Sequence, residues 1–248
     1  MRHAIWTDFR GVLTPPLRDG LLAYCAGKEF TPGQLGTCLR AIAERHGCPD
    51  GMAVLDSGVL TEREWAAEIE QQLSGRFGVD ADLSRVGDEW WSDRRIDEEW
   101  LSALRTWRDA GVFVGMISNL PPDWKDHFAA FAPWDGLFDE VLLSCDLGTR
   151  KPEPAMFRLA ESRSGLPPEA NVLVDDLHDN VAGARRAGWT GVLGGGAATR
   201  AAVEHIDSLV RSGAPQQGVR TDAPQQGVRT DAPQPLVRTG ALHQGAAR

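Results

Sequence analysis

Short runs of apolar residues alternate with amphipathic segments along most of the chain. The apolar runs lie at 3–8, 112–118, 140–144 and 171–175, with a weaker one at 190–193. Helical patterns separate the later runs, at about 96–109, 122–131, 153–164 and 179–187. Short apolar runs bounded by turn residues are typical of buried strands, and strands that alternate with helices are typical of a parallel sheet covered on both faces. The pattern therefore predicts an α/β fold.

The segment between the first two apolar runs does not alternate in this way and is predicted to be a helical insertion. Apolar residues recur at helical spacing in two stretches: Leu35, Leu39 and Ile42, and then Trp65, Ile69 and Leu73. Thr61 and Glu64 have the spacing of a capping box, in which each side chain accepts a hydrogen bond from the other residue's backbone N–H. We therefore expect a helix to begin just after Thr61.

The last part of the chain is repetitive. A nine-residue unit rich in Pro, Gly and Gln runs from Ala214 to Asp222, is repeated from Ala223 to Asp231, and is followed by a divergent copy from Ala232 to Gly240. A unit with so few apolar side chains cannot offset the entropy cost of ordering its backbone, which predicts a disordered tail over 213–248. A repeated docking peptide is the alternative interpretation.

Composition narrows the classes of function. Apolar residues make up 42% of the chain and charged residues 25%, as in ordinary globular proteins, and the formal net charge is -9. An acidic chain is a poor general binder of nucleic acid, so we expect none as a partner. No apolar stretch is long enough to cross a bilayer, so we expect no membrane contact and a cytoplasmic location. The four cysteines lack a metal or redox spacing and are predicted to be reduced thiols. The sequence carries no signal for an oligomeric state.

Polar residues with catalytic potential follow four of the apolar runs, where the strands are expected to end. They are Asp8 and Arg10 after the first run, Ser118 and Asn119 after the second, Lys151 in the loop after the third, and Asp175, Asp176 and Asn180 at the fourth. Because the carboxyl ends of parallel strands meet at one edge of a sheet, we expect these residues to lie close together. Three acidic groups at one point repel one another, so a cation or a raised pKa must relieve them, and oxygen ligands suit Mg²⁺.

An Asp, a Ser, a Lys and an acidic pair, in this order, resemble the four motifs of the haloacid dehalogenase-like (HAD) hydrolase superfamily. The resemblance spans residues 1–14 and about 96–195, and the helical insertion lies where the family places a cap domain. The segments SCDLGTRKPEPAMF (144–157) and VDDLHDNVAGARRAG (174–188) are similar to those of the branch with a helical cap. The resemblance implies a Rossmann-like core over 1–14 and 96–212 and a cap over 15–95.

The resemblance also implies a hydrolase that acts through a covalent aspartyl intermediate. Asp8 would be the nucleophile, since a carboxylate can attack phosphorus or an activated carbon, and Lys151 would hold it against a small anionic substrate. Ser118 and the backbone N–H of Asn119 would bind oxygens of the transferred group.

The metal implied by the same resemblance is Mg²⁺. It would bind Asp8, Asp176 and the backbone carbonyl of Arg10, with Asp175 within reach. Asn180 would orient these ligands.

One position departs from the pattern of the family's phosphatases. They usually carry a second Asp two residues after the nucleophile, which acts as general acid and base, whereas this chain has Arg10. A guanidinium keeps its protons throughout the working pH range and only donates hydrogen bonds. Loss of a positioned acid or base costs about 10² to 10⁴ in rate, so ordinary alkyl phosphates are expected to turn over poorly.

Three hypotheses follow. In the first, which we favour, the protein is a Mg²⁺-dependent phosphatase whose Arg10 anchors an anionic part of the substrate. In the second, it resembles a 2-haloacid dehalogenase, because a halide leaves without a proton, although the acidic pair at 175–176 indicates a metal site that dehalogenases do not need. In the third, it is a binding or regulatory protein that keeps the scaffold and its anion pocket.

Overall fold

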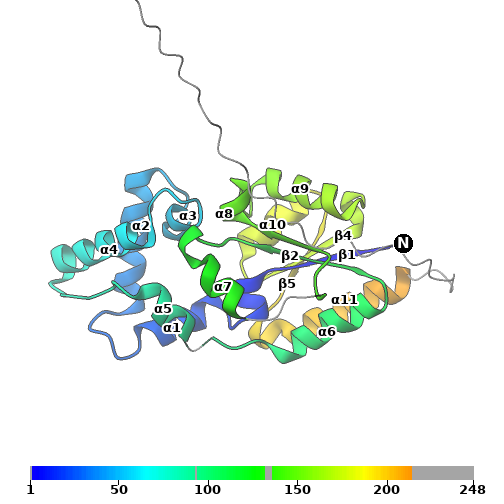
Figure 1. Cartoon of the computed structure of the whole chain (residues 1–248), viewed down its shortest axis with the longest axis horizontal. Helices are drawn as coiled ribbons and strands as arrows, with labels where there is room; N and C mark the ends of the chain where they lie inside the picture. Colours follow the sequence, from blue (N-terminus) through cyan, green and yellow to red (C-terminus); the bar gives the residue numbers. More distant parts are fainter. Residues whose placement is uncertain (1, 93, 132–135, 214–248) are drawn as a thin grey trace, which may run out of the picture. The chain divides into compact units, whose positions relative to one another are not determined.

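The computed structural model describes residues 2–92, 94–131 and 136–213, and its centre is a five-stranded parallel sheet (Figure 1). The strands are β1 (Ala4–Thr7), β2 (Phe113–Ser118), β3 (Glu140–Leu143), β4 (Asn171–Asp175) and β5 (Thr190–Leu193). Their order across the sheet is β3-β2-β1-β4-β5. The α/β prediction is confirmed, and each strand lies within an apolar run identified in the sequence.

Helices cover both faces of the sheet, and successive strand residues point to opposite faces. Ile5 of β1 belongs to an apolar cluster with α6 (Glu98–Asp109) and α11 (Thr199–Gly213). Its neighbour Trp6 belongs to a second cluster with α9 (Pro154–Ser164) and α10 (His178–Arg186). Figure 1 shows these two pairs of helices on opposite sides of the strands. The topology leaves β1 at the centre, with β2 and β4 as its hydrogen-bonded neighbours.

Between β1 and α6, the described residues form a short helical segment (Phe9–Leu13) and then five α-helices, which make up the helical insertion that the sequence predicts. They are α1 (Leu17–Cys25), α2 (Pro32–His46), α3 (Gly51–Asp56), α4 (Glu62–Phe77) and α5 (Val86–Ser92). The capping box at the start of α4 is confirmed: Glu64 N donates to Thr61 Oγ1 at 3.3 Å, and Thr61 N donates to Glu64 Oε2 at 2.9 Å. Figure 1 shows these helices grouped beyond one end of the sheet. The division of the chain at residues 15 and 95 stays a prediction.

The structure also contains elements that the sequence pattern did not identify. A short helix, α8 (Ser144–Leu147), begins directly after β3. The helical pattern predicted at 122–131, in contrast, is present as a helical turn (Pro122–Trp124) followed by α7 (Lys125–Phe131). Two further turns lie at Pro168–Ala170 and Gly196–Ala198. The largest addition is α11, which includes Gly213, the first residue of the expected tail; residues 214–248 of that tail lie outside the described residues.

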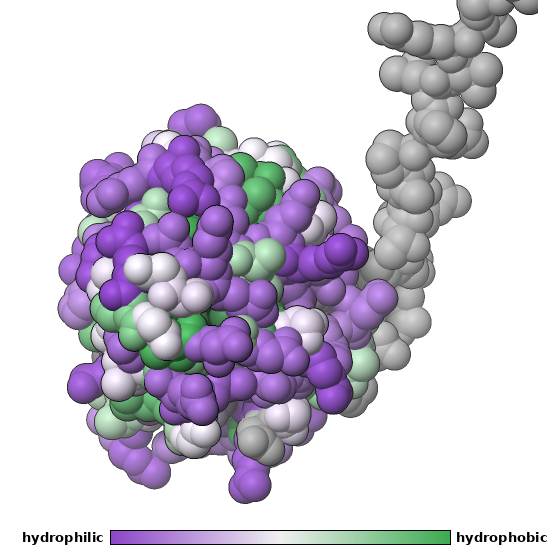
Figure 2. All heavy atoms as spheres, turned by 90° about the vertical axis from the view of Figure 1, so that its left-hand side faces the viewer, coloured by the Kyte–Doolittle hydropathy of each residue, from purple (hydrophilic) through white to green (hydrophobic). Residues whose placement is uncertain are grey.

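The visible surface of the inserted helices is mainly hydrophilic (Figure 2), as expected for a chain in which 25% of the residues are charged. Figure 2 views the end formed by the inserted helices and shows a mainly hydrophilic face with small apolar areas. None of the helices in the described part of the chain combines the length and apolar character needed to cross a bilayer. The four cysteines are free thiols, as predicted.

Candidate active site

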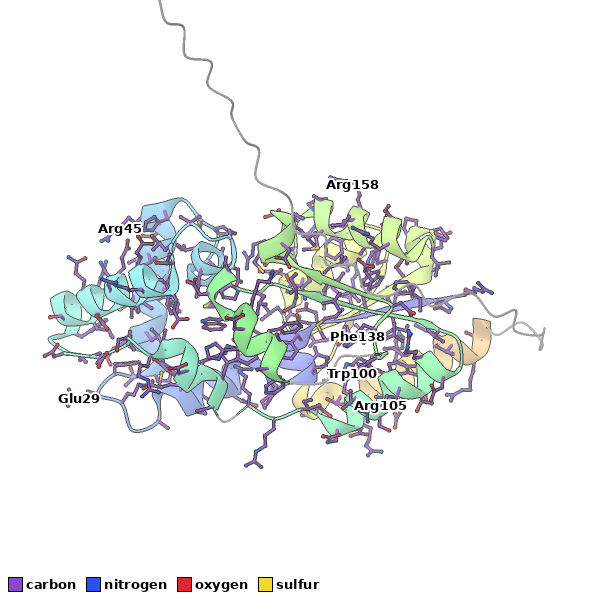
Figure 3. The ribbon with its side chains drawn as sticks, viewed as in Figure 1. Glu29, Arg45, Trp100, Arg105, Phe138 and Arg158 are labelled. Carbon is purple, nitrogen blue, oxygen red and sulfur yellow. The ribbon has the colours of Figure 1, made fainter. Side chains whose placement is uncertain are left out.

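Asp8 lies at the carboxyl end of the central strand, and its backbone is held from two sides. Asp8 N donates to Val174 O of the neighbouring strand at 2.9 Å. Thr7 Oγ1 donates to Asp8 O at 2.7 Å and accepts from Trp100 Nε1 at 2.9 Å. Trp100 comes from α6 and is fully buried (Figure 3). A buried indole from the covering helix thus fixes the residue that precedes Asp8.

A single lysine joins two of the predicted acidic residues. Lys151 Nζ donates to Asp8 Oδ1 at 2.7 Å and to Asp175 Oδ2 at 2.6 Å, and all three side chains are buried. Asp176 completes a carboxylate cluster, which we define as Asp8, Asp175 and Asp176: one oxygen from each lies within 4.8 Å of the other two. Residues that are far apart in the chain are therefore brought together as predicted.

This environment favours the protonated form of Asp8 in the absence of a cation. Burial raises the pKa of Asp8 from its ordinary value to about 7; Lys151 opposes the shift, and the nearby charges of Asp175 and Asp176 add to it. The pKa of Asp176 is also raised, first by burial and then by Asp175. One ammonium group thus does not balance three carboxylates.

The carboxylate cluster fits a divalent cation with oxygen ligands. Asp175 has both oxygens occupied, because Oδ2 accepts from Lys151 while Oδ1 accepts from Asn180 Nδ2 and Leu177 N, both at 2.9 Å. Asp176 Oδ1, in contrast, is buried and has no hydrogen-bond partner among the described residues. A buried carboxylate oxygen without a partner is costly, and Mg²⁺ is bound in proteins by such oxygens. Asp176 is thus the better ligand of the acidic pair, with Asp175 tied to the lysine.

The loop after Asp8 leaves little space beside Asp176. Gly11 has φ +111°, and a Cβ at this position would lie 2.1 Å from Asp176 Oδ2. The same oxygen accepts a hydrogen bond from Leu17 N at 3.1 Å. A glycine is required here both by the backbone conformation and by the close approach of the carboxylate.

Ser118 and Asn119 lie at the end of β2, next to the central strand. Ser118 Oγ is fully buried and has no hydrogen-bond partner among the described residues, so its hydroxyl is unused by the protein. Asn119 holds the backbone of Lys151 through two bonds: its Nδ2 donates to Lys151 O at 2.9 Å, and Lys151 N donates to its Oδ1 at 2.8 Å. The resemblance assigned a role only to the backbone N–H of Asn119, and no sequence pattern predicted the contact of its side chain with Lys151.

Arg10 turns toward the inserted helices rather than toward the carboxylate cluster. Its Nη2 donates to Asp56 Oδ1 at 2.9 Å, and Asp56 is the last residue of α3. Arg150 Nη2 donates to the other oxygen of the same carboxylate at 3.3 Å. We call Arg10, Asp56 and Arg150 the arginine bridge. Burial raises the pKa of Asp56, and the two guanidinium groups oppose that shift.

Sequence reasoning missed Asp56 and Arg150. The two ion pairs join residues 46 and 94 positions apart, and no local pattern marks either partner. Arg150 does stand next to Lys151 in the third motif, which was the one available signal.

A cavity of about 820 Å³ connects Asp8, one member of the carboxylate cluster, with the arginine bridge. Its walls include Asp8, Asn119 and Lys151 on the sheet side and Leu39, Met52 and Asp56 on the side of the inserted helices. Arg10 and Arg150 also line it. This volume is in the usual range for small-molecule sites, about 300–1,000 Å³.

Comparisons with known proteins identify the family and the fold. A family model described as haloacid dehalogenase-like hydrolase matches residues 16–188. The chain is similar to a phosphoserine phosphatase of Thermus thermophilus, with 34% identity over 158 residues that cover 61% of each protein. The chain spans only 26%, 50% and 61% of the lengths of three curated relatives that it matches.

Two solved structures share the fold. An L-2-haloacid dehalogenase, RSc1362, has a TM-score of 0.60 at 17% identity, covering 83% of this chain and 99% of that one. A HAD family enzyme of Bacteroides thetaiotaomicron, in complex with magnesium and inorganic phosphate, has a TM-score of 0.54 at 20% identity, covering 78% and 94%. At these identities the likeness extends to the fold alone.

Proposed function

The chain belongs to the haloacid dehalogenase-like hydrolases, and from this premise we propose that it is a Mg²⁺-dependent phosphatase that hydrolyses a phosphate ester of a small molecule. The observation that carries the proposal is the contact of Lys151 with both Asp8 and Asp175, beside an Asp176 oxygen that has no partner. A nucleophile that is held in place beside a carboxylate oxygen able to bind a cation is suited to phosphoryl transfer.

Asp8 begins the reaction as the nucleophile. An ionised Oδ oxygen of Asp8 attacks phosphorus, the bond from phosphorus to the ester oxygen breaks, and that oxygen leaves with the bonding electron pair. Lys151 holds the other Asp8 oxygen, which aims the carboxylate at the substrate. The unused hydroxyl of Ser118 and the backbone N–H of Asn119 then donate to the phosphoryl oxygens as negative charge develops on them.

Water ends the reaction. It attacks the phosphorus of the aspartyl phosphate and releases one proton to solvent, since Arg10 cannot accept it. The bond from phosphorus to the Asp8 oxygen breaks, and inorganic phosphate and free Asp8 are released. The buried position of Asp8 limits access of other nucleophiles to the intermediate.

Mg²⁺ would be held by Asp8, Asp176 and the backbone carbonyl of Arg10, with Asp175 kept in position by Asn180 and Lys151. When bound, the cation supplies positive charge that neutralises the carboxylates and the phosphoryl oxygens. The Bacteroides structure, which contains magnesium and inorganic phosphate on the same fold, supports this choice of metal.

The substitution at position 10 defines which esters react well. No carboxylic acid stands at position 10, two residues after the nucleophile, because Arg10 occupies it and is bound to Asp56. The leaving oxygen therefore receives no proton from this position, which favours esters whose leaving group is a weak base, such as aryl phosphates. The inserted helices (15–95) serve as the cap that encloses the substrate.

Two reaction mixtures test the proposal. Purified protein is incubated with p-nitrophenyl phosphate and Mg²⁺, and separately with a 2-haloacid and EDTA. We expect phosphate release in the first mixture and no halide release in the second. Halide release without phosphate release would instead support a dehalogenase. This is the second candidate because Arg10 stands in place of the general acid, and a halide leaves without receiving a proton. The shared fold of RSc1362 is consistent with that candidate.

A further inference from the structure

The arginine bridge lies in the same cavity as Asp8, and the reaction described above does not use it. We propose that Arg10 and Arg150 form a subsite for a second acidic group of the substrate, so that the preferred substrates are phosphate esters of acids. This inference rests on the proposed function, because it assumes that a phosphoryl group lies against Asp8. The acidic group is a carboxylate or a second phosphate, which share the same recognition chemistry.

The first argument is the imbalance of hydrogen-bonding groups in the bridge. Both guanidinium groups contact the single carboxylate of Asp56, which is 1% exposed. Arg10 Nη1 and Arg150 Nε are buried and have no hydrogen-bond partner among the described residues. Each of the two arginine side chains is about nine-tenths buried, so these two donors are also largely removed from water. An acceptor group that enters the cavity would remove this cost.

The second argument is that one partner of Arg150 can be exchanged. Arg150 Nη1 donates to Asp50 Oδ2 at 3.1 Å, and the side chain of Asp50 is 52% exposed. Exposed ion pairs contribute only about 0–1 kcal/mol, so an acidic group of the substrate can replace Asp50 at this nitrogen at little cost. Asp56 cannot leave in the same way because it is buried, and it keeps the two cations close together.

The third argument is the position of the bridge along the chain. Arg10 follows the nucleophile by two residues, and Arg150 directly precedes Lys151, which holds the nucleophile. Both guanidinium groups are thus attached to the backbone that builds the phosphoryl site. A second acidic group a few bonds from the ester oxygen would meet them, whereas a longer body would lie against the apolar cap residues Leu39 and Met52.

The test compares two phosphonates that the enzyme cannot hydrolyse. Phosphonoacetate and propylphosphonate have similar sizes, but only the first carries a carboxylate. Each is titrated calorimetrically into the full chain with excess Mg²⁺. We expect phosphonoacetate to bind at least about 10-fold more tightly, which corresponds to one charge-assisted hydrogen-bonded contact.

Three variants assign that preference to the bridge. Arg150→Gln should lower the ratio of the dissociation constant of propylphosphonate to that of phosphonoacetate toward 1, with Arg10 keeping part of the preference. Asp50→Asn should increase the ratio, because it removes the competing carboxylate while Asn keeps the N-cap contact with Ala53 N at the start of α3. Arg186→Gln is the matched control, because Arg186 is an exposed cation that lines the same cavity, and the ratio should change by less than about twofold.

The outcomes separate this inference from the proposed function. Equal binding of the two phosphonates, or an unchanged ratio in Asp50→Asn, would overturn the subsite and leave the phosphatase intact. Absence of binding by both phosphonates would overturn the phosphoryl site, on which both proposals rest. Melting temperatures show whether each variant is folded. If Arg150→Gln does not fold, the titration of Asp50→Asn tests the subsite by itself.

Discussion

Asp8 combines burial, a lysine contact and two carboxylate neighbours, and each of these affects its charge. Its pKa of about 7 lies well above the ordinary value for aspartate. In the metal-free protein, ionisation of Asp8, which nucleophilic attack requires, is therefore less favourable than ionisation of an ordinary aspartate. A divalent cation at the carboxylate cluster would favour ionisation of Asp8, so metal binding would also activate the nucleophile.

This gives a prediction about stability and pH. Because the folded protein binds the Asp8 proton more tightly than the unfolded chain does, the free energy of unfolding should fall as the pH rises from about 4 to about 7. Melting temperatures measured across this range in EDTA should decrease, and Mg²⁺ should weaken the decrease. Asp8→Asn, which cannot titrate, is the control and should flatten the curve. A curve that is unchanged by that substitution would assign the effect to other groups.

A second prediction concerns the residue that replaces the usual acid. Arg10→Asp alone should lower the free energy of unfolding by about 3–5 kcal/mol, because it breaks a buried ion pair and places a carboxylate near Asp56. The double variant Arg10→Asp/Asp56→Asn removes that repulsion. It should recover stability and raise kcat/KM for an alkyl phosphate, up to the about 10² to 10⁴ that a positioned acid provides. Urea unfolding measures the stability of both variants, and steady-state kinetics measures kcat/KM. Asp56→Asn alone is the control. If Arg10→Asp is as stable as the wild type, Arg10 and Asp56 do not form a pair in solution.

At the scale of elements, short-range signals explain which features the sequence could predict. The strands follow from apolar runs, and the start of α4 follows from Thr61 and Glu64, which are three positions apart. The apolar spacing of Ala202, Ile206 and Leu209 is a signal of the same kind for α11, a helix that was not predicted. The ion pairs at the end of α3 are different, because Asp56 contacts two arginines that are 46 and 94 positions away.

The capping box provides a prediction at this scale. Thr61→Ala should lower the free energy of unfolding by about 1 kcal/mol, because the N–H of Glu64 loses its acceptor at the start of α4. The rate with p-nitrophenyl phosphate should stay close to that of the wild type, because Thr61 does not line the main cavity. Thr61→Ser keeps the hydroxyl and is the matched control, expected to retain most of the stability. Chemical unfolding measures the change in stability, and an assay with p-nitrophenyl phosphate measures the change in rate. A large fall in rate would show that α4 also positions the active site.

At the scale of the whole molecule, the parallel sheet brings the predicted residues together. The order β2-β1-β4 places the ends of three strands side by side, so Ser118, Asp8 and Asp175 meet although more than fifty positions separate each from the next. This much follows from the rule that functional residues gather at the carboxyl ends of parallel strands. The direction of the Arg10 side chain did not follow from it, because that direction depends on the inserted helices and their carboxylate at Asp56.

The covalent bond between Asp8 and the transferred phosphoryl group is the most direct test. The full chain is mixed with p-nitrophenyl phosphate and Mg²⁺, quenched in acid within the first turnovers, digested, and analysed by mass spectrometry. The account predicts one phosphoryl group on the peptide that contains Asp8, and none in the Asp8→Asn variant. Turnover with no modified peptide, or with the phosphoryl group on another residue, would contradict it.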